Sequence, residues 1–184
     1  MDEARLNQLL DRFPVVELLV VGDFFLDRYL DLDRRLSETS LETGLEAYQA
    51  LGVRCSPGAA GTVVNNLRAL DVQVAVLGLI GDDGEGYELK RALAARCANV
   101  RHLLVHPDRL TPTYTKPMMR EVDGQIHELN RVDIKNRLPL PEPLQAQIAS
   151  LLRALASTVD GIIVADQVTE PNCGVITSRV RATL

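Results

Sequence analysis

The sequence predicts an α/β fold, with a doubly wound, mainly parallel sheet and a small antiparallel β-lid. Short apolar runs alternate with helical patterns along the 184 residues, and β–α units of this kind place helices on both faces of a parallel sheet. Two stretches, 30–54 and 112–133, interrupt the alternation because they carry no helical stripe. We expect both to stand off the main sheet as the lid, within one domain spanning 1–184.

The first part of the chain contains a helix, a strand and a loop that leads into a second helix. Apolar residues recur at helical spacing over 6–13, and Pro14 ends that helix. Residues 17–23, ELLVVGD, are apolar on both faces, which is typical of a buried parallel strand. The small-residue loop at 56–61 runs into a helix whose core face carries Val63, Val64, Leu67 and Leu70.

The middle of the chain repeats the strand and helix pattern. Residues 72–84 form a strand closed by a Gly/Asp loop, and 86–98 form a helix with Leu89, Leu93 and Cys97 on one face. Another strand is expected over 99–105. The lid segment that follows has two strand-like runs around Asp123-Gly124, a pair that favours a tight hairpin turn.

The last part of the chain is expected to contain two helices separated by a strand. The helix at 141–157 opens with prolines and has a strong apolar stripe. A buried strand is predicted over 161–167, and 172–184 is predicted to be helical. Because a doubly wound sheet rarely stops after a helix, we expect the C-terminal part of this fold to be missing from the chain.

Composition excludes several classes of protein. The formal charge of −5 and the lack of a basic stripe argue against a nucleic-acid partner. Cys55, Cys97 and Cys173 are isolated, so neither a zinc site nor a disulfide framework is indicated. The acidic, amphipathic start is unlike a signal peptide, and no apolar run is long enough to span a membrane. We therefore expect a cytoplasmic protein with no membrane partner.

Polar residues at the carboxyl ends of the predicted strands are the first candidates for a ligand site. Asp23 and Asp27 follow the first strand, and Asp166 and Gln167 end the last one. Carboxylates accept protons from hydroxyl groups, so this arrangement would suit a polyol. Each residue also has a simpler interpretation that stays open. For Asp23 it is the capping of a turn, and for Asp27 it is an ordinary salt bridge.

Glycine-rich segments offer two weaker signals. The loop before the helix at Val63 exposes backbone N–H groups that can meet an anion or hydroxyl, although packing alone also explains it. The segment 78–86 suggests a nucleotide or Mg²⁺ site, but its spacing is neither GxGxxG nor a P-loop. A turn followed by a helix N-cap is the preferred interpretation. A dinucleotide-dependent oxidoreductase is set aside because only one glycine follows the first strand. His102, His106 and His127 have no partners at catalytic or metal spacing.

Five segments in order resemble the ribokinase-like (PfkB) carbohydrate kinases, nearest to the heptose-7-phosphate kinase branch. They are VVGDFFLDRY, SPGAAGTVVNNLRAL, LGLIGDDGEG, TPTYTKPMMR with HELNRVD, and IIVADQ. Together they cover about 16–177, nearly all of the chain. The resemblance implies a ribokinase-like fold, a sugar or sugar phosphate as ligand, and in many members a homodimer formed through the lid.

The resemblance also implies roles for particular residues. Asp27 would bind sugar hydroxyls, and the loop at Gly58, Ala59 and Thr62 would contact the sugar. Lys116 would reach the sugar or its phosphate from the lid. The remaining implied residues shape the lid hairpin or the rim of the pocket: Arg131, Asp133, Asp166 and Gln167.

The sequence departs from the family pattern in two ways. Ala59 and Thr62 stand where the family has a second glycine and an asparagine, and Gln167 replaces a tyrosine. The catalytic Gly-Ala-Gly-Asp loop is not among the 184 residues. We therefore expect the substrate-binding half of an ATP-dependent kinase that uses Mg²⁺ at full length, with no cofactor bound to this chain and no catalytic residue in it. The alternative is a non-catalytic sugar-binding or regulatory module derived from such a kinase.

Overall fold

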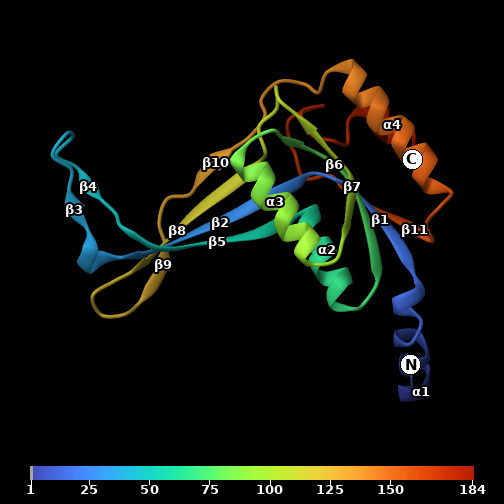
Figure 1. The fold of residues 1–184 in the computed structure, drawn as a ribbon, viewed down its shortest axis with the longest axis horizontal. Coiled ribbons are helices and arrows are strands. Elements are labelled where there is room, and N and C mark those ends of the chain that lie inside the picture. Colours follow the sequence, from blue (N-terminus) through green and yellow to red (C-terminus); the bar gives the residue numbers. More distant parts are fainter. Residues whose placement is uncertain (1) are drawn as a thin grey trace.

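The main sheet has four parallel strands, and helices cover both of its faces. A computed structural model describes residues 2–184 (Figure 1). The strands are β1 (Glu17–Gly22), β6 (Gln73–Gly81), β7 (Asn99–His106) and β11 (Gly161–Ala165), in the order β11-β1-β6-β7. Helices α2 (Ala60–Ala69) and α3 (Gly84–Ala95) lie on one face, and α4 (Glu142–Ala156) lies on the other. The predicted doubly wound parallel sheet is therefore confirmed.

Alternate residues of the central strand β1 enter two separate cores. Val20 packs with Val64 of α2 and Leu89 of α3, whereas Leu19 and Val21 pack with Ile148 and Leu152 of α4. All of these side chains are fully or almost fully buried. Burying each one contributes about 1.5–3 kcal/mol relative to exposure. A strand buried on both faces needs an unbroken apolar sequence, which explains why ELLVVG could be recognised.

A second sheet extends from the main body as an elongated blade (Figure 1). It consists of β2 (Phe24–Asp33), β5 (Ala50–Ala59), β8 (Thr113–Arg120), β9 (Ile126–Glu128) and β10 (Val132–Ile134). The order is β10-β8-β2-β5, with β9 paired to β8. The β2–β5, β8–β9 and β8–β10 pairs are antiparallel, but β2 and β8 run parallel. This sheet begins at Phe24, directly after β1, and ends at Ile134.

The tip of the second sheet carries a two-stranded ribbon that one arginine anchors. The ribbon pairs β3 (Glu38–Thr39) with β4 (Glu46–Ala47). Arg34, in the 3-10 turn Arg34–Leu36, donates two hydrogen bonds to Glu121 of the β8–β9 turn and two to Glu46 of β4. Its guanidinium also lies 5.3 Å from the ring centre of Tyr48. The ribbon and the hairpin are therefore linked through a single side chain.

Four local expectations are corrected. Leu70, expected on the core face of its helix, is the C-cap of α2 and is 48% exposed. Helix α1 (Glu3–Leu10) ends before Phe13, which begins a 3-10 turn with Pro14, and it buries no residue. Cys97 lies beyond α3, is exposed and has a φ of 58°, so it leaves the face formed by Leu89 and Leu93. The helix expected over 172–184 is reduced to α5 (Ser178–Arg181). Turns precede it, and there Val175 and Ile176 are buried as loop residues.

Candidate functional site

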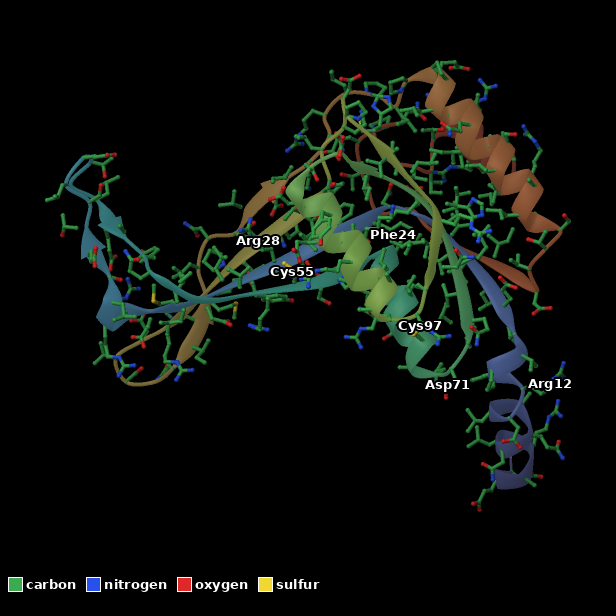
Figure 2. All side chains as sticks on the ribbon, viewed as in Figure 1. Arg12, Phe24, Arg28, Cys55, Asp71 and Cys97 are labelled. Atoms are coloured by element: carbon green, nitrogen blue, oxygen red, sulfur yellow. The ribbon has the colours of Figure 1, made fainter. Side chains whose placement is uncertain are left out.

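Asp27 lies within strand β2 rather than in a loop after β1. Side chains alternate along a strand, so Phe25, Asp27, Tyr29 and Asp31 share one side of the second sheet, which we call the Asp27 face. The other side carries Leu26 and Arg28, and there Arg28 approaches Glu85 of α3 at 3.4 Å. Figure 2 shows Phe24 at the body end of β2 and Arg28 farther along the strand. The Asp27 face therefore points away from α3.

An ion pair between neighbouring strands occupies the centre of the Asp27 face. Lys116 Nζ of β8 lies 2.9 Å from Asp27 Oδ1, and the two side chains are only 17% and 19% exposed. The same Nζ lies 3.4 Å from the Tyr29 hydroxyl and 5.0 Å from the centre of its ring. Burial lowers the pKa of Lys116, but the hydrogen bonds to Asp27 and Tyr29 outweigh it, and the net shift is upward. Lys116 is therefore charged, and its contacts with Asp27 and Tyr29 fix the position of its ammonium group.

Gly58 leaves room for the other oxygen of the Asp27 carboxylate. Gly58 lies in β5, and a Cβ at this position would stand 2.7 Å from Asp27 Oδ2, closer than real Cβ contacts allow. Ala59 follows with a φ of 52° and a ψ of −117°, a conformation that favours glycine. Ala60 then begins α2, and its N–H donates to the carbonyl of Asp23. The small-residue segment expected to be a loop is therefore the end of β5 and the start of α2, and it sets the Asp27 carboxylate against bare backbone.

Asp23 holds the loop that follows β11 in place. Its side chain is 3% exposed and accepts N–H bonds from Gln167, Val168 and Val175 at 2.7–3.1 Å. Burial raises the pKa of Asp23, while these three bonds oppose the shift. Of the two interpretations offered for Asp23, the capping one describes its contacts, because backbone donors surround both of its oxygens.

A cavity of about 150 Å³ lies beside this loop, at the carboxyl ends of the parallel strands. Phe25 and Tyr114, whose rings meet edge to face at 5.1 Å, form part of its wall. Arg109, Lys135 and Gln167 contribute polar groups to it. Because Tyr114 is the register partner of Asp27, the cavity is continuous with the base of the Asp27 face.

The remaining predicted residues are only partly gathered at this site. Thr62 is exposed on the first turn of α2. Arg131 donates two hydrogen bonds to Asp133 and lies 4.0 Å over the Tyr114 ring, which places it at the edge of the Asp27 face. Asp166 is paired with Arg181 at 2.5 Å on the surface and makes no contact with Asp27 among the interactions described for residues 2–184.

Sequence reasoning missed four residues of this region: Tyr29, Arg109, Tyr114 and Lys135. Three of them were recognisable. Tyr29 continues the alternation of Phe25 and Asp27, and Lys135 continues that of Arg131 and Asp133. Tyr114 stands two positions before Lys116. Arg109 gave no signal, because it lies in a turn that only the tertiary fold brings to the cavity.

The segment 78–86 forms a turn and a helix cap. Asp83 is the N-cap of α3 and accepts the N–H of Gly86. It also accepts hydrogen bonds from the backbone and hydroxyl of Thr111. Across the residues that the structure describes, no group of three His, Cys, Asp or Glu side chains is placed to hold a metal ion. Nor does any helix within 2–184 have the length and apolarity to cross a bilayer.

Comparison with known proteins identifies similar chains. The bifunctional protein HldE of Trichlorobacter lovleyi is 30% identical over 184 residues, which are 100% of this chain and 35% of HldE. HldE of Gluconobacter oxydans is 32% identical over 150 residues, 80% of this chain and 30% of that protein. The chain thus spans about a third of the length of these relatives. No protein-family model matches it.

A solved structure supports the fold. A putative sugar kinase from Clostridium perfringens superimposes with a TM-score of 0.54 and 15% identity, over 80% of this chain and 42% of that one. At this identity the likeness concerns the fold alone. It confirms the expected α/β architecture with a mainly parallel sheet, a fold shared with that sugar kinase.

Proposed function

We propose that the chain is the sugar-binding part of an ATP-dependent sugar or sugar-phosphate kinase of the ribokinase-like family, which its similarity to the HldE proteins supports. The observation that carries this proposal is the Asp27–Lys116 pair beside Gly58. Asp27 Oδ1 is engaged by Lys116, and Oδ2 faces a residue without a side chain. A sugar hydroxyl can donate to Oδ2 and a neighbouring hydroxyl can accept from Lys116, because one group only accepts and the other only donates.

Other candidate residues are assigned supporting roles in this proposal. Ala59 and Thr62 would contact the sugar from the start of α2, with Thr62 offering a hydroxyl. Arg131 would hold the edge of the face through Tyr114, and Gln167 would border the cavity on the loop fixed by Asp23. Asp166 has the weakest support, since its carboxylate is paired with Arg181.

Phosphoryl transfer would need parts that this chain does not supply. Transfer depends on charge stabilisation of the moving phosphoryl group, and the 184 residues contain no Gly-Ala-Gly-Asp loop. Residues 2–184 also offer no cluster of three ligands for Mg²⁺. ATP and Mg²⁺ are proposed as cofactors of the kinase at full length, which we place in the cytoplasm as part of the same proposal.

A homodimer through the second sheet is part of the proposal. The ribbon at its tip exposes Leu41 completely and Leu45 to 70%, and Val122 on the adjacent turn is 73% exposed. Apolar side chains gathered on a projecting ribbon are typical of an interface. Sedimentation of wild-type protein against a Leu41→Ser, Leu45→Ser variant tests this, with a monomeric variant as the expected result.

Calorimetric titration tests the sugar site. The wild-type chain is titrated with a heptose, its 7-phosphate, and ATP, and the sugars are expected to bind whereas ATP is not. Asp27→Asn should weaken sugar binding at least tenfold, about 1.4 kcal/mol. Asp31→Asn is the matched control, because Asp31 lies on the same face and strand and pairs with Arg54 at 2.8 Å. An equal loss of sugar affinity in both variants would contradict the proposal.

A second assay separates the kinase part from a non-catalytic module. Thr62 and Ala59 depart from the family loop, which favours a module whose pocket is under relaxed constraint. ADP release is measured with each sugar for the 184-residue chain and for any longer chain that the source DNA encodes past the codon for Leu184. Sugar-dependent ADP release by the longer chain alone supports the kinase part, and its absence in both supports the module.

A further inference from the structure

Three cations of the Asp27 face have carboxylate partners, whereas Lys135, which lines the cavity, has none within salt-bridge distance in the described part of the chain. Arg54 pairs with Asp31, Lys116 with Asp27 and Arg131 with Asp133, all within 2.9 Å. Lys135 follows Arg131 and Asp133 in the same alternation, and its Nζ lies 5.7 Å from the Tyr114 ring centre. Among residues 2–184, no carboxylate lies within 4.0 Å of this Nζ. Glu170 is near enough for Lys135 to help lower its pKa, but Glu170 is bonded to Arg137.

A second cation without a carboxylate lines the same cavity. Arg109 is 7% exposed and donates to two carbonyl oxygens, those of Leu138 and Cys173, at 3.0 and 2.8 Å. Its Nε is buried and has no hydrogen-bond partner among the described residues. Burial lowers the pKa of Arg109, which is the response of a cation held in a site without a counter-charge.

Two carboxylates, those of Glu170 and Asp23, also line the cavity, but other groups already bind both of them. Glu170 accepts hydrogen bonds from Arg137 and Thr169. Both oxygens of Asp23 are occupied by the backbone N–H groups of Gln167, Val168 and Val175. An isolated charge in a partly desolvated site is costly, and an opposite charge supplied by a ligand removes that cost. The cavity wall also offers the rings of Phe25 and Tyr114. A void of 150 Å³ holds a body of roughly six heavy atoms.

We infer that this cavity binds a small organic anion, with its carboxylate or phosphate at Lys135 and its body against Phe25 and Tyr114. Arg109 also lines the cavity, and although two of its donors are bound to carbonyl oxygens, its charge adds positive potential there. The anionic group belongs either to the sugar substrate itself or to a separate small molecule. The site adjoins the proposed sugar site but uses different residues, so each can be tested without the other.

The experiment is a titration of the whole chain with three probes: benzoate, benzyl alcohol as its uncharged counterpart, and inorganic phosphate. Benzoate and phosphate should bind, benzyl alcohol at least tenfold more weakly than benzoate. Lys135→Met should weaken benzoate at least tenfold, and Lys135→Arg should restore it. Lys90→Met is the matched control, because Lys90 is an exposed lysine of α3 and its loss changes the net charge equally.

Three outcomes overturn the inference: no benzoate or phosphate binding at millimolar concentration, equal binding of benzyl alcohol, or equal effects of Lys135→Met and Lys90→Met. Asp27→Asn separates the two proposals. Benzoate binding that survives this change supports the anion site whether or not a sugar binds. Competition between benzoate and the heptose 7-phosphate, but not the heptose, assigns the anionic group to the sugar, and simultaneous binding assigns it to a second molecule.

Discussion

Lys116 Nζ lies 2.9 Å from Asp27 Oδ1, and this contact joins two parallel strands that are far apart in the sequence. Each side chain has lost about four-fifths of its exposure to water. Removing one partner of an ion pair at this depth costs more than at the surface, because the other charge is left poorly solvated. The pair is thus a structural joint between β2 and β8 as well as the centre of the proposed sugar site.

A double-mutant cycle measures this joint. Asp27→Asn and Lys116→Met should each lower the free energy of unfolding by about 1–2 kcal/mol, less than a fully buried pair would cost. Together they should cost less than the sum, with a coupling of about 1 kcal/mol. Urea unfolding of the four proteins gives the values.

The same cycle at Asp31 and Arg54 is the control. This pair lies on the same face, but its side chains are 41% and 61% exposed, so its coupling should be about 0.5 kcal/mol or less. Equal coupling energies at the two pairs would contradict the view that burial strengthens the Asp27–Lys116 contact.

Ala59→Gly should stabilise the protein. Ala59 has a φ of 52° and a ψ of −117°, where a Cβ is strained and glycine is not. The gain should be about 1 kcal/mol, part of it cancelled by the freer unfolded chain of the variant. Thermal or urea unfolding measures it. Ala69→Gly, at the exposed last residue of α2, should instead cost a fraction of the roughly 1 kcal/mol that glycine costs inside a helix, and a loss at both positions would contradict the strain.

Asp33 should make stability depend on pH in the acid range. Hydrogen bonds from the Arg35 side chain and backbone lower the pKa of Asp33 to about 2. Because the folded-state pKa lies below the ordinary 3.8, the carboxylate stabilises the fold above about pH 4, and the contribution is lost as the pH falls toward 2. The difference in unfolding free energy between wild type and Asp33→Asn should shrink over that interval. When Arg35→Met is present in both proteins, this difference should depend less on pH. A wild-type difference that stays constant down to pH 2 would refute the assignment.

Strong periodicity made the main sheet predictable. The positions of β6 and α4 were predicted closely from the unbroken apolar run of β6 and the apolar stripe of α4. These apolar residues are the ones that each element buries in the core. The helix expected over 172–184 failed for the opposite reason. Val175 and Ile176 are buried there, but as loop residues beneath α4, and apolar composition alone does not separate a packed loop from a helix.

The second sheet was only partly accessible to sequence reasoning. The hairpin at Asp123-Gly124 follows from local turn chemistry, and Gly124 has the expected positive φ of 88°. The parallel pairing of β2 with β8 depends on segments that no local signal relates. For the same reason the resemblance implied a role for Lys116, but its ion pair with Asp27 and its contact with the Tyr29 hydroxyl were found only in the structure.

The contrast between two glycines of β5 tests whether the bare backbone beside Asp27 matters. A Cβ at Gly58 would lie 2.7 Å from Asp27 Oδ2 and 3.0 Å from Cγ. The carboxylate cannot move aside freely because Lys116 holds Oδ1. Gly58→Ala should therefore weaken sugar binding at least tenfold and cost about 1–3 kcal/mol of stability.

At Gly52, on the same strand and face, a Cβ would meet only Asp31 Oδ2 at an ordinary 3.6 Å, so Gly52→Ala should change stability by less than about 0.5 kcal/mol and leave binding intact. Calorimetry and urea unfolding of both variants decide the matter. Unchanged binding by Gly58→Ala would mean that the Asp27 carboxylate has room to move, and that the tight approach of β5 is not what positions it for a sugar.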